Sequence, residues 1–228
     1  MKPAAVVLFD FGGTLEADGV HWSPRFYAAY RRAGGSLDFP AFDPLFRASD
    51  AALGGIRGVT ALGFRAMIDA EVRLLVERLP LPDRDRVDAR AVAEGFHADA
   101  VAAVRRNVPV LERLSRRYRL GIVSNFTGNL KPCLDELGLA RLFAAVSDSG
   151  VVGWTKPDRR IFEHALTQLH ASPDRAWMVG DNFEADIRGA AALGMHTCWL
   201  APPERAAPAG FVPTARISRF AEIERVLP

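Results

Sequence analysis

Short apolar runs recur along the chain, and segments with helical periodicity lie between them. The runs predict β-strands at residues 4–9, 120–124, 143–147, 176–180, 196–200 and 215–217. Between them, residues 110–118 and 157–169 each place apolar side chains on one face of a helix. Strands that alternate with helices in this way form a parallel sheet with helices packed against it. The sequence therefore predicts an α/β fold.

A long connection interrupts this alternation after the first predicted strand. Residues 10–119 separate that strand from the second, far more than one crossover helix requires. Helical patterns lie at 26–31, 61–79 and 89–106, with glycine or proline breaks between them. We interpret this stretch as a helical cap over the sheet. The predicted division is a core of residues 1–14 and 107–228 and a cap of residues 15–106.

Composition narrows the class of partner. With 228 residues, 49% of them hydrophobic, the chain can bury a substantial core. The 29 basic and 27 acidic residues leave a net charge of +2, so we expect neither nucleic acid nor a membrane as a partner. The first apolar run meets Asp10 too early for a signal peptide, and the two cysteines lie far apart. We therefore expect a reduced, cytoplasmic protein.

Polar side chains follow the predicted strands at the sheet edge where parallel sheets bind ligands. The candidates are Asp10 after the first strand, Ser124 and Asn125 at the end of the second, Lys156 before a helix, and Asp181 and Asp186 after the fourth. Taken alone, the aspartates, Ser124 and Asn125 could cap a turn or a helix, and Lys156 could be a solvated surface lysine. Four segments that converge at one edge instead favour a single site.

This set of side chains suits the transfer of a phosphoryl group to a carboxylate. A carboxylate nucleophile such as Asp10 approaches an anionic phosphate, so cations must offset the repulsion between them. Asp10 and Asp181 can hold Mg²⁺, which prefers oxygen ligands, and Lys156 supplies a second positive charge. Ser124 offers a hydroxyl group to a phosphoryl oxygen. The glycines after Asp10 free backbone N–H groups to bind phosphate.

The motifs resemble, in order and spacing, the four motifs of the haloacid dehalogenase-like (HAD) hydrolase superfamily. They are Asp10-Phe11-Gly12-Gly13-Thr14, Ser124, Lys156-Pro157 and Gly180-Asp181-Asn182-Phe183-Glu184-Ala185-Asp186. The resemblance covers residues 4 to about 200. It is to the phosphatase-like branch, whose helical cap is inserted between the first two motifs.

The resemblance implies a Rossmann-like parallel sheet and an aspartyl-phosphate on Asp10. It also implies that Mg²⁺ is held by Asp10, Asp181 and the backbone carbonyl of Gly12, and that Asp186 supports the metal directly or through water. The residues assigned to phosphate binding and to the shape of its loop are Gly12, Gly13, Thr14 and Asn125.

Gly12 departs from the family pattern, because most phosphatases of the family have an aspartate two residues after the nucleophile. That aspartate protonates the leaving group and then activates water, and its loss costs about 10²- to 10⁴-fold in rate. Three explanations remain open. Glu16, Asp18 or His21 substitutes for it, or the leaving group needs no acid, as in an acyl phosphate, or turnover is slow and the protein mainly binds its ligand.

The sequence predicts a Mg²⁺-dependent phosphohydrolase that acts on a small phosphorylated metabolite. Gly12 and Gly180-Asp181 point away from a metal-free dehalogenase. Phosphonatase chemistry would need a cap lysine, and residues 15–106 contain none. The alternatives are a phosphotransferase or mutase, or a catalytically weak module that binds a phosphoryl ligand on the same fold.

Overall fold

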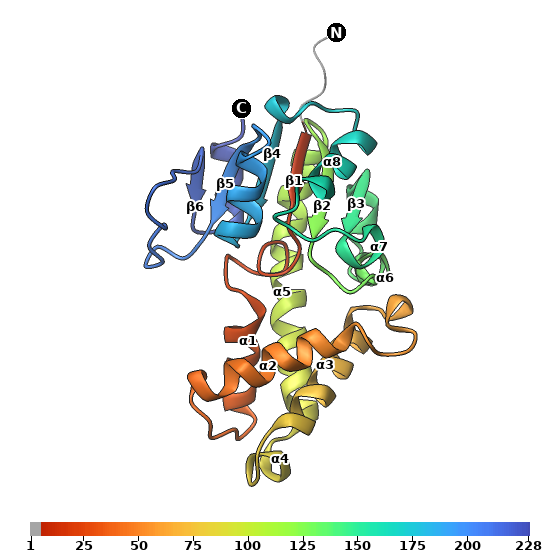
Figure 1. Cartoon of the computed structure of the whole chain (residues 1–228), viewed down its shortest axis with the longest axis vertical. Coiled ribbons are helices and arrows are strands. Elements are labelled where there is room, and N and C mark those ends of the chain that lie inside the picture. Colours follow the sequence, from red (N-terminus) through yellow and green to blue (C-terminus); the bar gives the residue numbers. More distant parts are fainter. Residues whose placement is uncertain (1–5) are drawn as a thin grey trace.

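Six parallel strands form one sheet in a computed structural model that describes residues 6–228 (Figure 1). They are β1 (Val6–Phe9), β2 (Arg119–Ser124), β3 (Ala145–Asp148), β4 (Ala176–Gly180), β5 (His196–Leu200) and β6 (Ala215–Ile217). The order in the sheet is β3-β2-β1-β4-β5-β6, and all neighbouring strands are parallel. This confirms the predicted α/β fold with a Rossmann-like sheet. Residues 4 and 5 of the first predicted strand lie outside the described residues.

The central strand β1 is buried on both faces, as its unbroken apolar sequence predicts. Because side chains alternate along a strand, Val6 and Leu8 join one hydrophobic cluster, while Val7 and Phe9 join another. The helix α8 (Arg159–Gln168) packs on the first face, and the end of α5 (Ala89–Ser115) packs on the second. Buried on both sides, β1 holds the residue that follows it in a fixed position.

Short helices and turns complete the part around the sheet. The helices are α6 (Leu130–Glu136), α7 (Ser149–Val152) and α9 (Gly189–Ala191), and the segment Phe183–Arg188 after β4 forms a π-helical turn. Single 3₁₀ segments occur at Ala140–Leu142, Pro173–Arg175 and Phe220–Arg225. These elements leave free the carboxyl edge of the central strands.

The connection between β1 and β2 is helical, as predicted. It contains α1 (Trp22–Arg32), α2 (Phe39–Leu53), a 3₁₀ turn (Val59–Ala61), α3 (Phe64–Arg78), α4 (Asp83–Arg86) and α5. Figure 1 shows α1 to α4 gathered beyond one end of the sheet, with α5 running from them to the sheet. We call residues 15–106 the helical insertion.

The helix α5 differs from the prediction. The sequence indicated two helices, at 89–106 and 110–118, whereas the structure has one helix of 27 residues with Pro109 inside it. The physical reason is that the buried face continues without a change of phase through Val104, Asn107, Leu111 and Leu114. Packing along this face outweighs the backbone hydrogen bond that a proline removes from a helix.

Aromatic side chains form the interior of the helical insertion. Phe26 of α1 stacks on Phe96 of α5, with ring centroids 3.9 Å apart, and Phe46 of α2 lies 5.0 Å from Phe26. Each of these rings is almost fully buried. These contacts fix α2 against α1 and α5, and so fix which face of α2 turns toward the sheet.

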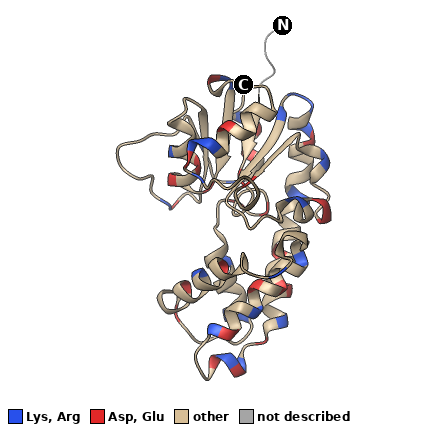
Figure 2. Cartoon of the chain, turned by 45° about the vertical axis from the view of Figure 1, so that its right-hand side comes forward, with Lys and Arg blue, Asp and Glu red and all other residues tan. Residues whose placement is uncertain are grey.

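Figure 2 shows Lys and Arg residues mixed with Asp and Glu residues along the helices of both parts of the molecule. The two signs of charge therefore largely offset each other over the helical surface.

None of the helices described for residues 6–228 is both long enough and apolar enough to cross a bilayer.

Candidate active site

Three polar residues meet at the carboxyl edge of the sheet because their strands are neighbours. Asp10 follows β1, Ser124 ends β2 and Asp181 follows β4, and β1 lies between the other two strands. The backbone N–H of Asp10 donates to the carbonyl of Val179 at 2.9 Å, which continues the sheet register by one residue. The order of the strands thus places one carboxylate in the middle of the edge and a polar residue on each side.

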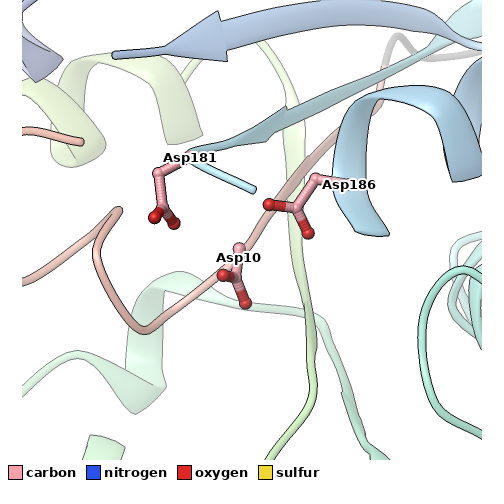
Figure 3. A group of neighbouring side chains, drawn as sticks. All are labelled: Asp10, Asp181 and Asp186. Carbon is pink, nitrogen blue, oxygen red and sulfur yellow. The ribbon is translucent and has the colours of Figure 1, made fainter. Parts of the chain in front are cut away.

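A cluster of three buried carboxyl groups forms there. Oxygens of Asp10, Asp181 and Asp186 lie within 4.8 Å of one another. Figure 3 shows the three side chains grouped where the segments after β1 and β4 meet. The π-helical turn after β4 positions Asp186, whose Oδ2 accepts a hydrogen bond from the backbone N–H of Asn182 at 2.9 Å. The structure therefore brings together all three carboxylates proposed from the sequence.

Lys156 lies between two of these carboxylates. Its Nζ is 2.7 Å from Oδ1 of Asp10 and 2.6 Å from Oδ1 of Asp186. Burial disfavours the charged ammonium, but the two carboxylates more than compensate, so the pKa of Lys156 is raised. The lysine is therefore a buried, charged group held against the proposed nucleophile.

Asn125 holds the backbone of Lys156. Its Oδ1 accepts the backbone N–H of Lys156 at 2.7 Å, and its Nδ2 donates to the carbonyl of the same residue at 3.1 Å. The Asn125 side chain also lines the cavity at this edge. These two hydrogen bonds position the backbone of Lys156, and the contact of Asn125 with phosphate stays a prediction.

Two hydroxyl groups orient the carboxylates. Ser124 Oγ donates to Asp10 Oδ1 at 2.7 Å, and Thr14 Oγ1 donates to Asp181 Oδ1 at 3.2 Å. Since Ser124 and Lys156 both bind the same oxygen of Asp10, the side chain is held by that oxygen. The other oxygen of Asp10, Oδ2, is bound by neither of them and is the one available to react.

The charges of the cluster fit a divalent cation. Burial and the charges of Asp10 and Asp186 raise the pKa of Asp181, and burial raises the pKa of Asp186 to about 7 although Lys156 opposes this shift. Asp181 Oδ2 is buried and has no hydrogen-bond partner within residues 6–228. A buried acceptor without a partner is costly, and an oxygen-seeking ion such as Mg²⁺ would satisfy it. The residues present thus fit the metal implied by the resemblance.

The loop after Asp10 depends on glycine at position 13. Gly13 has φ of +81°, and a Cβ atom there would lie 2.6 Å from Asp181 Oδ2. Both observations exclude a larger residue without movement of the carboxylate. The backbone of this loop therefore passes directly beside the proposed metal ligand.

Trp22 occupies the space next to Gly12. A Cβ atom at position 12 would lie 3.2 Å from the indole Nε1 of Trp22. The same Nε1 donates to Glu16 Oε1 at 2.7 Å. A side chain at position 12 would therefore make a tight contact with the indole ring, which would have to shift to admit it.

Two of the three proposed substitutes for the missing acid lie away from the reacting groups. Glu16 is fully buried and binds the backbone N–H of Gly13, the Trp22 indole and the Arg25 guanidinium. Asp18 accepts from the backbone N–H of Phe220 at 2.9 Å and pairs with an arginine of α5. Neither lines the cavity. Because other protein groups occupy both carboxylates, the structure gives no support to Glu16 or Asp18 as the substitute acid.

A cavity of about 630 Å³ lies between the sheet edge and the helical insertion. Asp10, Gly12, Ser124, Lys156 and Asp186 line it from the sheet. From the insertion come His21, Trp22, Phe46, Asp50, Leu53, Val59 and Met67, among others. Of the three proposed substitutes, only His21 thus lines the cavity.

Two ionisable side chains of the insertion face the cavity. Both side chains are solvent-exposed, yet the protein around them disfavours their charged forms. This lowers the pKa of His21, against the charges of Asp10 and Asp50, and raises the pKa of Asp50, against the charge of His21. Reasoning from the sequence missed Asp50. The signal was present in the helical spacing of Phe46, Asp50 and Leu53, which puts them on one face of α2.

The parallel sheet and its covering helices form an α/β fold that places a buried cluster of carboxylates and a lysine at the carboxyl edge of the sheet. The chain belongs to the haloacid dehalogenase-like hydrolase family, since the model of that family matches residues 4–194.

Relatives and solved structures agree with this placement. A pyrimidine 5'-nucleotidase, YjjG of Escherichia coli, is 37% identical over 123 residues, which are 53% of this chain and 54% of that protein. A phosphoserine phosphatase of Thermus thermophilus is 36% identical over 49% of this chain and 47% of its own length. The chain thus spans about half the length of these curated relatives. A dehalogenase solved with an intermediate superposes with a TM-score of 0.66 at 18% identity, over 100% of this chain and 98% of that chain, which shows the shared fold.

Proposed function

We propose that this chain is a Mg²⁺-dependent phosphohydrolase that transfers the phosphoryl group of a small metabolite to Asp10 and then to water. The observation that carries the proposal is the double anchoring of Asp10 Oδ1 by Ser124 and Lys156 beside two further carboxylates. The nucleotidase and the phosphoserine phosphatase among its relatives, by their names, act on phosphate compounds, which supports this substrate class.

In the first step, Asp10 Oδ2 forms a bond to phosphorus while the bond from phosphorus to the ester oxygen breaks. Lys156 offsets the negative charge that the carboxylate and the phosphate bring together. The leaving oxygen departs with the bonding electrons and takes up a proton. Water then attacks phosphorus, which releases inorganic phosphate and restores the Asp10 carboxylate.

Asp10, Asp181, Asp186 and the carbonyl of Gly12 are the groups that would hold Mg²⁺. Once bound, the ion would supply positive charge to the phosphoryl oxygens. Lys156 and Ser124 both bind Oδ1 of Asp10. The protein groups therefore orient the nucleophile whether or not the ion contributes to orientation.

His21 is our candidate for the proton carrier in place of the aspartate missing at position 12. It lines the cavity with Asp10 and Gly12, and its lowered pKa favours the neutral ring, which can accept a proton from the attacking water. For the first half of the reaction, a substrate with a good leaving group relaxes the need for an acid.

We further propose that the helical insertion acts as a cap domain. In this division residues 1–14 and 107–228 form the catalytic core and residues 15–106 form the cap. The cavity walls support it, because the sheet contributes Asp10, Lys156 and Asp186, whereas the insertion contributes most of the apolar side chains.

A phosphotransferase or mutase is the second candidate. Position 12 carries glycine and so supplies no acid/base group, which would slow the attack of water on a phosphorylated Asp10. A longer-lived phosphoaspartate could then pass its phosphoryl group to a hydroxyl of a second molecule.

The test is the release of 4-nitrophenol from 4-nitrophenyl phosphate with and without Mg²⁺. Wild type should show metal-dependent release, and Asp10→Asn should reduce it by roughly 10³-fold or more. Asp99→Asn is the matched control, because Asp99 lies on the surface of α5 and pairs with Arg32. Release that persists in Asp10→Asn would refute the assignment of Asp10 as the nucleophile. If wild type hydrolysed neither aryl nor acyl phosphates, the proposed enzymatic activity would be refuted.

A further inference from the structure

We infer that the cavity selects phosphate monoesters whose leaving group carries an amine or hydroxyl group beside an apolar surface, and that Asp50 discriminates against a second acidic group. This inference rests on the proposed phosphohydrolase function and adds the substrate class. It comes from the charges and the apolar side chains of the cavity wall that the insertion contributes.

The wall facing the reacting groups is mainly apolar and well packed. Trp22, Phe46, Leu53 and Met67 line the cavity, yet each side chain is almost fully buried. Phe46 and Trp22 are both in contact with Phe26, which holds them within the aromatic interior of the insertion. Such a wall removes apolar surface of a leaving group from water without having to reorganise.

Asp50 is the carboxylate on this wall. It projects from α2 one turn after Phe46, and it faces the same cavity as Asp10, Lys156 and His21. A carboxylate accepts hydrogen bonds from hydroxyl groups and pairs with an ammonium group. Asp50 therefore offers a partner to a donor on the leaving group.

Among the described residues that line the cavity, no lysine or arginine is free to pair with a second acidic group on the substrate. Of the described residues that line it, Lys156 is the only lysine or arginine, and it is bound between Asp10 and Asp186. Arg47, whose charge also acts on Asp50, pairs with Asp43 at 2.7 Å, and its side chain is 72% exposed. A carboxylate or second phosphate on the leaving group would thus meet Asp50 without a compensating positive charge.

The size of this discrimination follows from Coulomb's law. Two unit charges about 6 Å apart at an effective dielectric constant of about 40 interact by about 1.4 kcal/mol, which is about tenfold in rate. Asp50 attracts an ammonium group on the substrate and repels a carboxylate, so the two interaction energies have opposite signs. Because the two opposite tenfold effects multiply, the ratio between an aminomethyl and a carboxylate substrate should respond to Asp50 by about 100-fold.

The experiment uses three phenyl phosphates that carry an aminomethyl, a hydroxymethyl or a carboxylate group in the meta position. We measure kcat/KM by phosphate release for wild type, Asp50→Asn, Asp50→Lys and the control Asp99→Asn. Asp50→Asn should lower the ratio of aminomethyl to carboxylate substrate about 100-fold, and Asp50→Lys should lower it further. Asp99→Asn, an equal charge change on an exposed residue outside the cavity, should leave the ratio at the wild-type value.

A second measurement needs no variant at Asp50. Salt screens charges in a solvent-filled cavity, so raising the ionic strength from about 0.05 to about 0.5 M should shrink the wild-type ratio. The inference is overturned if the ratio is unchanged in Asp50→Asn, or if the wild-type ratio does not change with ionic strength. In either case hydrolysis would still depend on Asp10. Hydrolysis of all three compounds by Asp10→Asn overturns the proposed function instead.

Discussion

Glu71 provides a quantitative test of the structure inside the helical insertion. The side chain lies on α3 and is fully buried, Ser49 Oγ donates to its Oε1 at 2.6 Å, and its Oε2 has no partner within residues 6–228. Burial raises the pKa of this carboxyl from 4.5 to about 8, although the Ser49 hydrogen bond opposes the shift. The folded protein therefore keeps a proton on Glu71 over a pH range in which the unfolded chain has lost it.

The sign of the effect follows from proton linkage. Below pH 4.5 both states are protonated and the group costs nothing, whereas between pH 4.5 and 8 the folded state binds more protons. Its stability then falls by about 1.4 kcal/mol per pH unit. The loss is about 4 kcal/mol by pH 8 and levels off above that value, once the folded state also ionises. Glu71→Gln removes the titration, so its advantage over wild type should grow as the pH rises.

The assay is urea unfolding of wild type and Glu71→Gln at pH 5 and pH 8. The difference in free energy of unfolding between the two proteins should change by about 3 to 4 kcal/mol in favour of glutamine, and other titrating groups cancel in that difference. Glu77→Gln, at an exposed position on the same helix, should show no such change. A difference that is independent of pH, or that favours wild type at pH 8, would refute the burial of an unpaired carboxyl.

Two further substitutions test the reacting groups. Gly12→Asp should lower the stability by about 1 to 3 kcal/mol without a gain in turnover, because Trp22 Nε1 lies 3.2 Å from the position of the new Cβ. Thermal unfolding and aryl phosphate kinetics check it, and a large gain in turnover at unchanged stability would contradict it. Lys156→Met in the presence of EDTA should cost about 3 to 5 kcal/mol, because the buried carboxylates of Asp10 and Asp186 lose their cation. Wild-type stability in that variant, measured by urea unfolding, would show that the carboxylates do not need the lysine.

The sheet and the grouping of the charged residues could be predicted from the sequence, because both depend on short-range patterns. Val6 to Phe9 form an unbroken apolar run, which requires burial on both faces, and this places the strand in the centre of the sheet. Once β1 lies between β2 and β4, the residues after these strands share one edge by geometry alone. The meeting of Asp10 with Asp181 follows from that order.

The orientation of side chains outside the strands could not be predicted in this way. Glu16 is close to the nucleophile in the sequence, but its carboxylate turns into the interior to bind Trp22 and Arg25. Asp50 is 40 positions from the nucleophile in the chain, and it reaches the cavity only because Phe26, Phe46 and Phe96 fix the rotation of α2. Such rotations depend on contacts between elements that a single sequence does not pair.

The continuity of α5 has a consequence for how the molecule denatures. Phe96, near its start, belongs to the same hydrophobic cluster as Leu111 and Leu114, near its end, and as Phe9 of the sheet. The continuous helix α5 therefore joins the helical insertion and the part around the sheet in one hydrophobic interior. Neither half can lose its packing without exposing part of the other. We expect a cooperative transition in which the two halves melt together, so the pH titration of one carboxyl in the insertion reports on the entire chain.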